Sequence, residues 1–568
     1  MKKTIQKIKN NKRTIIIAAS ILIISFGFVR PADKDFEIAK NLDIFVTMFR
    51  EISSLYVDAK EPKELIDASI EGMLSSLDPY SSYIPEEDID EFKFMTTGKY
   101  GGIGALIRKA GAYTMISEPY EGFPAQKSDV RAGDTIITID GVSTKNKSIN
   151  EVSELLKGNP NTELKLELKR IGVDSVITKT FNRKEITIPN VPYYGMMKGD
   201  IGYIMLGNFM RNSGLETKTA LTELKEKGAK AIILDLRGNP GGLLNEAVNV
   251  TNIFTPRGQE VVTTRGKNKE IQSVYKTTTA PVDTVIPLAV LVNRGSASAS
   301  EIVAGSLQDL DRAVIIGQRT FGKGLVQTTR PLSYNAHVKF TTAKYYIPSG
   351  RCIQAVDYSN RNEDGSVGII PDSLKTEFNT RNGRLVYDGG GVEPDIKIEG
   401  DSPGNITLAL YTKNLLFDFA TLFHVEKPKI TMACAFEITD SIYNSFIEYV
   451  LKTDFDYNTS SSEKLNELTK ISKREGYYDL IKDDINSLEA KLHGDTRKDL
   501  ETFRKEIAEL LKDEIVSRYY FQKGRVEASL QEDPEVNKAM EILENPVTIS
   551  KILDGSYEGE TVFAYRSH

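Results

Sequence analysis

The segment IPLAVLVNRGSASASEIVAGSLQD, Ile286 to Asp309, sets an apolar run, a serine-rich turn and a helical pattern in direct succession. The run IPLAVLVN, Ile286 to Asn293, is typical of a strand buried on both faces of a sheet. NRGSASASEIVAGS, Asn293 to Ser306, then carries four serines and leads into a helix. The turn is a flexible polar connection, a helix cap or the cradle of a nucleophile, and the order strand–turn–helix favours an α/β architecture.

The same alternation continues on both sides of this segment. AIILDLRG, Ala231 to Gly238, is a second continuous apolar strand, and a glycine turn leads from it into the helical pattern GGLLNEAVNVTNIF. Strand and helix patterns alternate in this way from about 190 to 400. This alternation predicts an α/β layer fold.

The regions before and after this core have a helical pattern. Residues from 35 to about 95 place apolar side chains three and four positions apart, and the breaker LDPYSSYIP, Leu77 to Pro85, ends the second helix there. From about 403 to 556 the chain is rich in charged residues, with Glu and Lys pairs at four-residue spacing. Such pairs are typical of solvated helix faces.

A small β-rich module is expected from about 97 to 186. Its helix, Ser148 to Gly158, begins with a capping box formed by Ser148 and Glu151. The stretch ELKLELKR, Glu163 to Arg170, alternates strictly, which predicts a half-buried strand.

Length, composition and charge limit the possible classes of protein. The chain has 568 residues, too many for one hydrophobic core, so several domains are expected. The net charge of -6 argues against a nucleic-acid partner, because phosphate binding requires a basic surface. Two cysteines, Cys352 and Cys434, are too few for a disulfide framework, so we expect two free thiols, and no Cys or His cluster suggests a structural zinc.

The first thirty residues have the pattern of an export segment. MKKTIQKIKNNKR is basic, and TIIIAASILIISFGF, Thr14 to Phe28, is apolar and uncharged. A basic stretch followed by an apolar one is typical of a secretory signal peptide or signal anchor. We therefore expect the rest of the chain to lie outside the cytoplasmic membrane, in a periplasmic or membrane-anchored location, whether or not the segment is cleaved.

A serine nucleophile needs a base, and histidines are scarce in this sequence. The four histidines are His337, His424, His493 and His568. A Ser-His-Asp triad with one of them as the base is therefore poorly supported. Lysine is the other known base for serine when its pKa is lowered. Lys323, between two glycines in TFGKGLVQT, is such a candidate, although a simple turn lysine at the start of a strand is equally compatible with the pattern.

The serines of the turn are expected to differ in role. Ser296 is expected to stabilise the turn, and Ser300, directly before Glu301, to cap the helix. Ser298 lies between two alanines, which leave its hydroxyl open, and a helix N-terminus favours a nucleophile there. Backbone N–H groups for an oxyanion are expected from RGNPGGLLNEA, Arg237 to Ala247, at the carboxyl end of a buried strand.

Taken together, these stretches resemble the C-terminal processing peptidases, also called tail-specific proteases. The motifs occur in family order and cover most of residues 50 to 400. They are LDPYSSYI, GGIGALI, AGDTIITIDG, LDLRGNPGGLLNEAV, VNRGSASASEIVAGSLQD, RTFGKGLVQ, TTAKYYIPSGRCIQ and GVEPDI. The pair NRGSASASEI and TFGKGLVQ is the most specific part of this resemblance.

The resemblance implies a serine endopeptidase with a Ser/Lys dyad and without a metal or organic cofactor. Ser298 takes the place of the nucleophile and Lys323 that of the general base, while Gln327 matches the glutamine that orients the lysine. The oxyanion hole is expected from the backbone of Ala299 and of one of two glycines. These two glycines are Gly241 and Gly242.

The β-rich module resembles a PDZ domain, which adds a substrate tail as an extra strand and holds its carboxylate with loop N–H groups. Here the loop position is taken by Gly101, Gly102, Ile103 and Gly104, and the helix from Ser148 forms the other wall of the groove. The expected partners are proteins or peptides with free C-terminal tails. An adaptor or a second copy of the chain is a further possible partner.

The expected architecture is thus a multidomain α/β protein: a layered protease core with an inserted PDZ-like domain and a helical region at each end. Its expected parts are residues 1–34 (signal or anchor), 35–96 (N-terminal helical segment), 97–186 (PDZ-like domain), 187–402 (Ser/Lys protease core) and 403–568 (C-terminal helical region). The last region binds a partner, dimerises, covers the groove or is a solvated appendage.

Two alternatives remain at this point. The chain is a non-catalytic PDZ-bearing binding protein or chaperone on a protease-like core, or an acyl-CoA-type enzyme on a related α/β layer fold. The presence of Ser298, Lys323 and Gln327 together favours the peptidase over the first alternative. The PDZ-like module and the export segment argue against the second.

Overall fold

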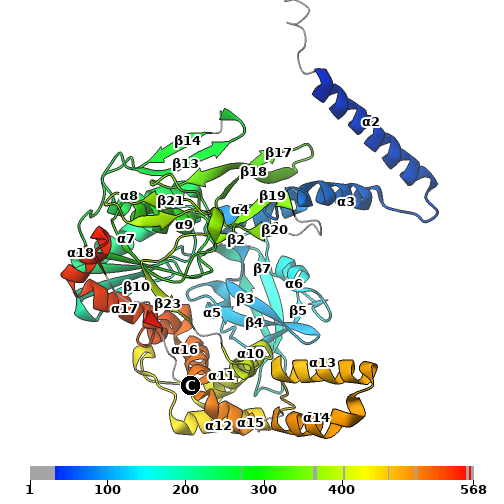
Figure 1. The fold of residues 1–568 in the computed structure, drawn as a ribbon. Coiled ribbons are helices and arrows are strands. Elements are labelled where there is room, and N and C mark those ends of the chain that lie inside the picture. The colour runs from blue at the N-terminus through cyan, green and yellow to red at the C-terminus, as the bar shows by residue number, and fades with distance from the viewer. Residues whose placement is uncertain are drawn as a thin grey trace, which may run out of the picture. The chain divides into compact units, whose positions relative to one another are not determined.

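The computed structural model describes residues 32–557 and 562–563, apart from 270–271, 362–366, 401–402, 458–459 and 493–495 (Figure 1). The chain forms two compact units, residues 1–83 and 84–568. The expected export segment lies almost wholly in residues 1–31, outside the described residues. Among the helices that are described, none is long and apolar enough to cross a membrane.

The described part of the first unit contains two long helices, as its sequence pattern predicts. Helix α2 spans Ala32–Leu55, and helix α3 spans Pro62–Ser75 with a proline in its first turn. Proline suits this position because the first helical N–H groups have no intrahelical acceptor.

A seven-stranded sheet forms the centre of the second unit. The strand order is β10-β11-β12-β15-β16-β23-β24, and β10 and β11 are antiparallel while the other neighbours are parallel. The strands are β10 (Tyr193–Met197), β11 (Ile201–Met205), β12 (Ala231–Asp235), β15 (Leu288–Val292), β16 (Val314–Gly317), β23 (Ile396–Glu399) and β24 (Val562–Phe563). Strands β12 and β15 are buried along their whole length, which confirms the prediction from their apolar runs.

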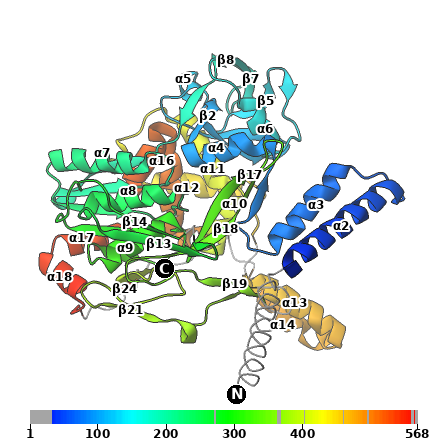
Figure 2. The ribbon, with the colours of Figure 1, turned by 90° about the horizontal axis from the view of Figure 1, so that it is seen from above.

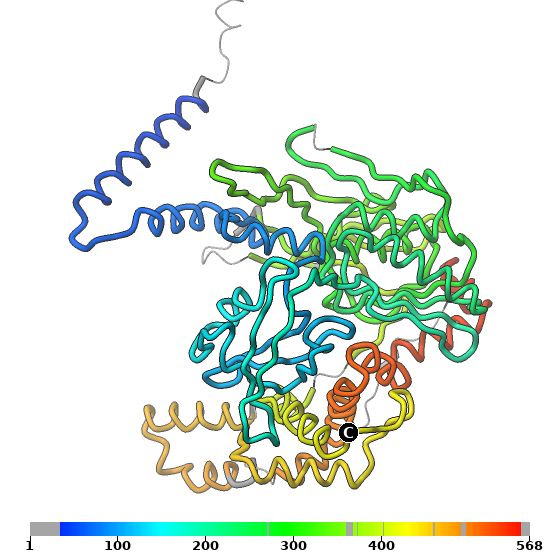
Figure 3. The backbone as a smooth tube through the Cα atoms, turned by 180° about the vertical axis from the view of Figure 1, so that it is seen from behind, coloured from blue at the N-terminus to red at the C-terminus, as the bar shows by residue number. Residues whose placement is uncertain are grey.

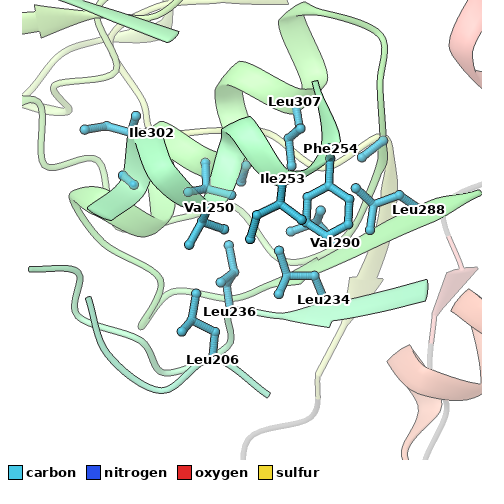
Figure 4. Close-up of a cluster of buried hydrophobic side chains, with 14 of the residues drawn as sticks. Leu206, Leu234, Leu236, Val250, Ile253, Phe254, Leu288, Val290, Ile302 and Leu307 are labelled. Carbon is cyan, nitrogen blue, oxygen red and sulfur yellow. The ribbon is translucent and has the colours of Figure 1, made fainter. Parts of the chain in front are cut away.

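Three helices pack on one face of this sheet. They are α7 (Ser213–Glu226), α8 (Leu244–Phe254) and α9 (Ala299–Asp309). Leu234 and Val290 of the strands meet Ile253 and Phe254 of α8 and Leu307 of α9 in the main hydrophobic core (Figure 4). This core fixes α9, and with it the serine-rich turn, at the carboxyl edge of the sheet.

The opposite face is covered by helices from the distant end of the sequence. These helices are α17 (Pro534–Leu543) and α18 (Pro546–Asp554), which Figure 2 labels side by side. They pack with Ile233 and Leu291 of the strands in a second core. Part of the region after 403, whose role the sequence left open, therefore completes the α/β layer around the central sheet rather than projecting from it.

The β-rich module has its own sheet and core. Its sheet contains β3 (Ala105–Ala110), β4 (Tyr113–Pro119), β5 (Thr135–Ile139), β6 (Val142–Ser143), β7 (Glu163–Lys169) and β8 (Ile177–Asn182). Strands β2 (Lys99–Gly102) and β9 (Lys184–Thr187) pair separately, and helices α5 (Pro124–Lys127) and α6 (Ile149–Leu156) complete the module. The predicted capping box of Ser148 and Glu151 is present at the start of α6.

A second, antiparallel sheet carries the lysine segment. Among its strands are β13 (Glu260–Gly266), β14 (Ser273–Lys276), β17 (Leu325–Pro331) and β18 (His337–Tyr346), with β18 between β13 and β17. Short strand pairs follow, β19 (Val356–Arg361) with β20 (Val367–Ile369) and β21 (Glu377–Asn379) with β22 (Leu385–Tyr387). A short helix, α4 (Ile89–Thr97), precedes β2.

The remaining helices form a region that packs against the β-rich module (Figure 3). They are α10 (Asn405–Thr412), α11 (Leu415–Glu426), α12 (Asp440–Leu451), α13 (Ser460–Glu475), α14 (Tyr478–Leu492), α15 (Thr496–Thr502) and α16 (Arg504–Ser529). The guanidinium of Arg108 on β3 lies 3.3 Å from the ring centroid of Phe417 on α11, and Arg525 on α16 pairs with Glu118 on β4 at 2.7 Å. The fold therefore confirms the predicted multidomain α/β architecture with an inserted module and helical regions.

Candidate active site

Ser298 occupies the junction between β15 and α9. It is the N-cap of α9, with φ 55° and ψ −109°, a conformation that non-glycine residues rarely adopt. Such a strained residue persists only where the surrounding structure holds it in place. Its side chain is partly exposed, whereas Ala297 and Ala299 on either side are buried.

The other two serines of the turn are structural. The hydroxyl of Ser296 donates to the carbonyl of Leu236 at 2.8 Å and accepts from the N–H of Asn293, so its predicted role in stabilising the turn is confirmed. The prediction that Ser300 caps the helix is wrong. Ser300 already lies in the first helical turn and is buried, and its hydroxyl donates to the carbonyl of Asn239 at 2.9 Å.

Lys323 lies in the turn between β16 and β17 and is partly buried. The glycines on either side permit close packing of this turn. A Cβ on Gly322, which has φ +86°, would lie 2.4 Å from the Cβ of Ala355, and one on Gly324 would lie 2.8 Å from the N of Gln354. The structure thus confirms that the flanking glycines allow close backbone approach.

The carboxylate of Glu301 joins the serine turn to the lysine turn. Its Oε2 accepts the N–H of Ser298 at 2.8 Å and the N–H of Lys323 at 2.9 Å. Its Oε1 accepts the hydroxyl of Thr320 at 2.6 Å and the N–H of Gly322 at 2.7 Å. Four donors on one buried side chain fix the two turns relative to each other.

Glu301 is fully buried, and its ionisation reflects two opposing effects. Burial raises its pKa to about 7, while the four hydrogen bonds favour the charged form and lower the pKa in part. An ionised carboxylate is an acceptor only, which suits a site that presents donors alone. Glu301 was not among the predicted site residues, although Ser298 followed three residues later by Glu301 is a capping-box pattern that could have indicated it.

The hydroxyl of Tyr345 is a second link between the same two turns. Tyr345 is a buried residue of β18, and its hydroxyl lies 3.1 Å from the carbonyl oxygen of Ser298 and also hydrogen-bonds the carbonyl oxygen of Lys323. The structure therefore brings Ser298 and Lys323 together through Glu301 on their N–H groups and through Tyr345 on their carbonyls.

Gln327 lies on β17, the strand that follows the lysine turn. Its side-chain Nε2 donates to the hydroxyl of Thr341 on β18 at 3.0 Å. This bond holds the amide across the β17–β18 hairpin, four residues after Lys323.

The glycine turn after β12 touches the serine turn. A Cβ on Gly241 would lie 2.6 Å from the carbonyl oxygen of Ala297 and 2.8 Å from the N of Ala299, so only glycine fits at this position, which has φ +96°. The N–H of Gly241 donates to Oδ1 of Asn239 at 2.9 Å. Within the described part of the chain, the N–H groups of Gly242 and Ala299 have no hydrogen-bond acceptor.

The predicted tail-binding residues lie where β2 leads into β3. Gly101 and Gly102 are the last residues of β2 and pair with β9, whereas Ile103 and Gly104 form the connection to β3. Gly104 has φ +72°. Helix α6 contacts β3 across the module, and β3 is an edge strand of its sheet.

The remaining candidate residues have no catalytic arrangement. Cys352 and Cys434 are free thiols, as predicted, and burial raises the pKa of Cys352, which disfavours a reactive thiolate. Of the four histidines, His337 stacks on Phe92 and His424 meets a tyrosine ring, while His493 and His568 lie outside the described residues. Among the described residues, no group of three or more His, Cys, Asp or Glu side chains is placed to hold a metal ion.

Four family models match separate parts of the chain. The model described as peptidase family S41 matches residues 200–374, and a PDZ domain model matches residues 115–170. The model described as the C-terminal helical domain of a probable PDZ-protease matches residues 406–543, and that of the N-terminal domain of the activating protease CtpB matches residues 28–88.

Proteins with similar sequences or structures are described as C-terminal processing proteases. A carboxy-terminal-processing protease of Bartonella bacilliformis is 36% identical over 362 residues, which span 63% of this chain and 80% of that protein. The carboxy-terminal processing protease CtpA of Bacillus subtilis is 37% identical over 309 residues, or 54% of this chain and 65% of that protein. The solved structure of a photosystem II D1 C-terminal processing protease is 28% identical, covers 63% of this chain and 87% of its own, and has a TM-score of 0.35.

The α/β core and the PDZ module together define a serine-type peptidase. The chain belongs to the carboxy-terminal-processing proteases of peptidase family S41.

Proposed function

We propose that Ser298 is the nucleophile and Lys323 the general base of this peptidase, acting on proteins whose C-terminal tails the PDZ module captures. One observation carries the assignment: a single carboxylate oxygen of Glu301 accepts the backbone N–H of both residues, at 2.8 and 2.9 Å. One atom that accepts an N–H from each turn holds the two backbones close together, and a nucleophile and its base require such proximity.

The mechanism follows from these positions. The neutral amine of Lys323 takes the hydroxyl proton of Ser298 as the oxygen attacks the substrate carbonyl carbon. The lysine then gives this proton to the leaving amine as the peptide C–N bond breaks, and an acyl-enzyme remains. Water activated by the same lysine hydrolyses the ester and restores the hydroxyl of Ser298. Gln327 orients the lysine amine from the next strand.

The oxyanion of the tetrahedral intermediate is assigned to two backbone donors, Gly242 and Ala299. The N–H of Gly241 already serves Asn239, so between the two candidate glycines Gly242 is favoured. Gly241 contributes by its size, because its lack of a side chain lets the glycine turn lie against the serine turn. Donors fixed before the reaction stabilise the developing charge without reorganisation.

Tail recognition is assigned to the edge of β3. An edge strand offers unpaired backbone groups to which an extended peptide can add as a further strand. The connection formed by Ile103 and Gly104, together with Gly101 and Gly102 before it, would receive the terminal carboxylate. Helix α6 supplies the side wall.

We also infer export from the basic and apolar N-terminal segment, which places the catalytic unit outside the cytoplasmic membrane, in the periplasm or anchored to the membrane. An adaptor or a second copy of the chain as partner remains a prediction.

The test uses the purified full-length chain and an unfolded protein with an apolar C-terminal tail. The wild type, Ser298→Ala and Lys323→Ala are compared with Ser300→Ala, a matched control that removes a hydroxyl from the same turn. We expect cleavage by the wild type and by Ser300→Ala, and none by the other two. Equal cleavage by Ser298→Ala would refute the assignment of the nucleophile. Tail binding without cleavage in all four proteins would instead favour the binding-protein alternative.

A further inference from the structure

A salt-bridge cluster joins the C-terminal helical region to the start of the glycine turn. We propose that Asp533 and Glu535, at the N-terminus of α17, are positioning residues for the oxyanion-binding turn and act on it through Arg237. The proposal rests on the function proposed above, because it concerns the geometry of that same site.

Arg237 lies between β12 and the glycine turn and is held on one side by Asp235, the last residue of β12. Its Nη2 lies 2.6 Å from Oδ2 of Asp235, and its Nε lies 3.1 and 3.0 Å from the two carboxylate oxygens. The hydroxyl of Tyr203 donates to the same Oδ2 at 2.6 Å. The carboxylate of Asp235 therefore sets the plane of the guanidinium, because paired contacts of this kind fix its orientation.

The other side of Arg237 is held from a distant part of the sequence. Its Nη1 lies 2.8 Å from Oδ2 of Asp533 and 3.3 Å from Oε2 of Glu535. Arg237 and Asp533 are 296 positions apart, yet both side chains are only 17% exposed, and that of Glu535 is 13% exposed. In so enclosed a place, removal of either partner would leave a charge poorly compensated.

The cluster has its own electrostatic balance. Burial raises the pKa of Glu535, and the neighbouring Asp533 raises it further, while Arg237 opposes both effects. Burial lowers the pKa of Arg237, but the attraction to Asp235 and Asp533 outweighs this effect and holds the pKa well above its usual value. The guanidinium is thus the shared counter-ion of three carboxylates, and each of them constrains its position.

Residues on both sides of Arg237 hydrogen-bond the serine turn. The carbonyl of Leu236 accepts the hydroxyl of Ser296 at 2.8 Å, and the N–H of Gly238 donates to the side chain of Asn293 at 2.9 Å. The carbonyl of Asn239 accepts the N–H of Ala297 at 3.0 Å. A shift of Arg237 would therefore move the glycine turn and the serine turn together, and with them both proposed oxyanion donors.

Helix α17 is well anchored to serve as a support. It packs against β12 and β15, the two strands that lead into the glycine and serine turns. Asp533 is also its N-cap and accepts the N–H of Val536 at 3.0 Å. The acidic end of the helix therefore has a fixed position relative to both strands.

The experiment compares Asp533→Asn, Glu535→Gln and the double variant in the full-length chain. Asparagine is as good an N-cap as aspartate, so Asp533→Asn removes the charge and keeps the helix start. The matched control is Glu541→Gln on the same helix, whose partner is Lys538 and not Arg237. The measurements are kcat and KM for a tail-bearing peptide, thermal unfolding, and the rate at which a fluorophosphonate labels the active serine.

A positioning role predicts a fall in kcat and in labelling rate per folded molecule, because both depend on the oxyanion donors. We expect about tenfold for the double variant and about threefold for Glu535→Gln, with KM within about twofold and with Glu541→Gln unchanged. If the variants unfold at lower temperature but keep the wild-type kcat and labelling rate, the cluster only stabilises the fold and the proposal is overturned. Wild-type protein that neither cleaves nor labels would instead overturn the proposed function.

Where the double variant fails to fold, the two single variants decide the matter, because Asp533→Asn keeps the N-cap and Glu535→Gln keeps the shorter contact between Arg237 and Asp533. A wild-type labelling rate in both of these folded variants overturns the proposal.

Discussion

Replacing Glu301 by glutamine changes one oxygen of the carboxylate to an amide nitrogen. Each oxygen of Glu301 now accepts two donors: Ser298 and Lys323 on one, Thr320 and Gly322 on the other. A glutamine amide has one acceptor and two donors at this position. If the amide nitrogen faces Ser298 and Lys323, both of their N–H groups lose their acceptor. If it faces Thr320 and Gly322, the N–H of Gly322 loses its acceptor, whereas the hydroxyl of Thr320 can accept from the amide.

The magnitude follows from the bonds that are lost. An unsatisfied buried donor costs about 1–3 kcal/mol, so the loss of one or two acceptors costs about 1–6 kcal/mol. If the smallest of these values falls on the alignment of Ser298 with Lys323, kcat drops about fivefold, since each 1.4 kcal/mol is about a factor of ten. We therefore expect Glu301→Gln to retain at most about a fifth of wild-type kcat.

Stability gives a second, pH-dependent signature. The pKa of Glu301 is raised from 4.5 to about 7, so the folded state binds this proton more tightly than the unfolded state. The wild type therefore loses stability as the pH rises through this window, by about 3 kcal/mol in total. Glutamine does not titrate, so the variant does not lose this stability. The free energy of unfolding of the variant relative to that of the wild type therefore rises as the pH increases through this window.

The assay measures initial rates on a fluorogenic peptide at about pH 8 and urea unfolding from about pH 5 to about pH 9. Glu541→Gln, exposed on α17, is the control for the same chemical change. A Glu301→Gln enzyme with kcat within about threefold of the wild type would refute the alignment argument. Identical pH dependence of stability in both proteins would refute the assigned ionisation.

Two further predictions concern other contacts. Gly241→Ala places a Cβ 2.6 Å from the carbonyl oxygen of Ala297, at a position whose φ is +96°. We therefore expect loss of cleavage and a lower midpoint of urea unfolding. Wild-type activity would contradict the close packing of the glycine and serine turns. Arg108→Ala removes a guanidinium that lies over Phe417, a contact worth about 0.5–2 kcal/mol. We therefore expect faster amide hydrogen exchange in the β-rich module, while cleavage of a short peptide is retained. Unchanged exchange would show that this contact does not hold the module.

The core strands and the motif residues were predictable because their patterns are local. The runs at Ala231 and Leu288 are apolar throughout, and these strands are buried as expected. Ser298 and Lys323 were proposed from their immediate neighbours, and the structure places their turns together. The assignment of the N-cap failed because both Ser298 and Ser300 fit the local pattern, and only tertiary contacts decide which of them bonds Asn239.

The contacts that join distant segments were not predictable. Tyr345 reaches Ser298 across 47 positions through the register of β18, which no pattern in a single sequence specifies. The apolar stripe of α17 shows that the helix buries one face, but not that the buried face meets the peptidase sheet. Arg237 is part of a glycine-turn motif, but no sequence pattern marks its partners at the start of α17, apart from their negative charge.

Because α17 and α18 pack on the central sheet, the fold of this sheet is complete only after these two helices have been translated. A nascent chain has already passed Ser298 and Lys323 when Pro534 is still to be translated. At that stage Ile233 and Leu291 lack the helices that shield them, and Arg237 has one of its acidic neighbours only. Ser298 and Lys323 are therefore synthesised well before the two helices that complete the contacts around their turns.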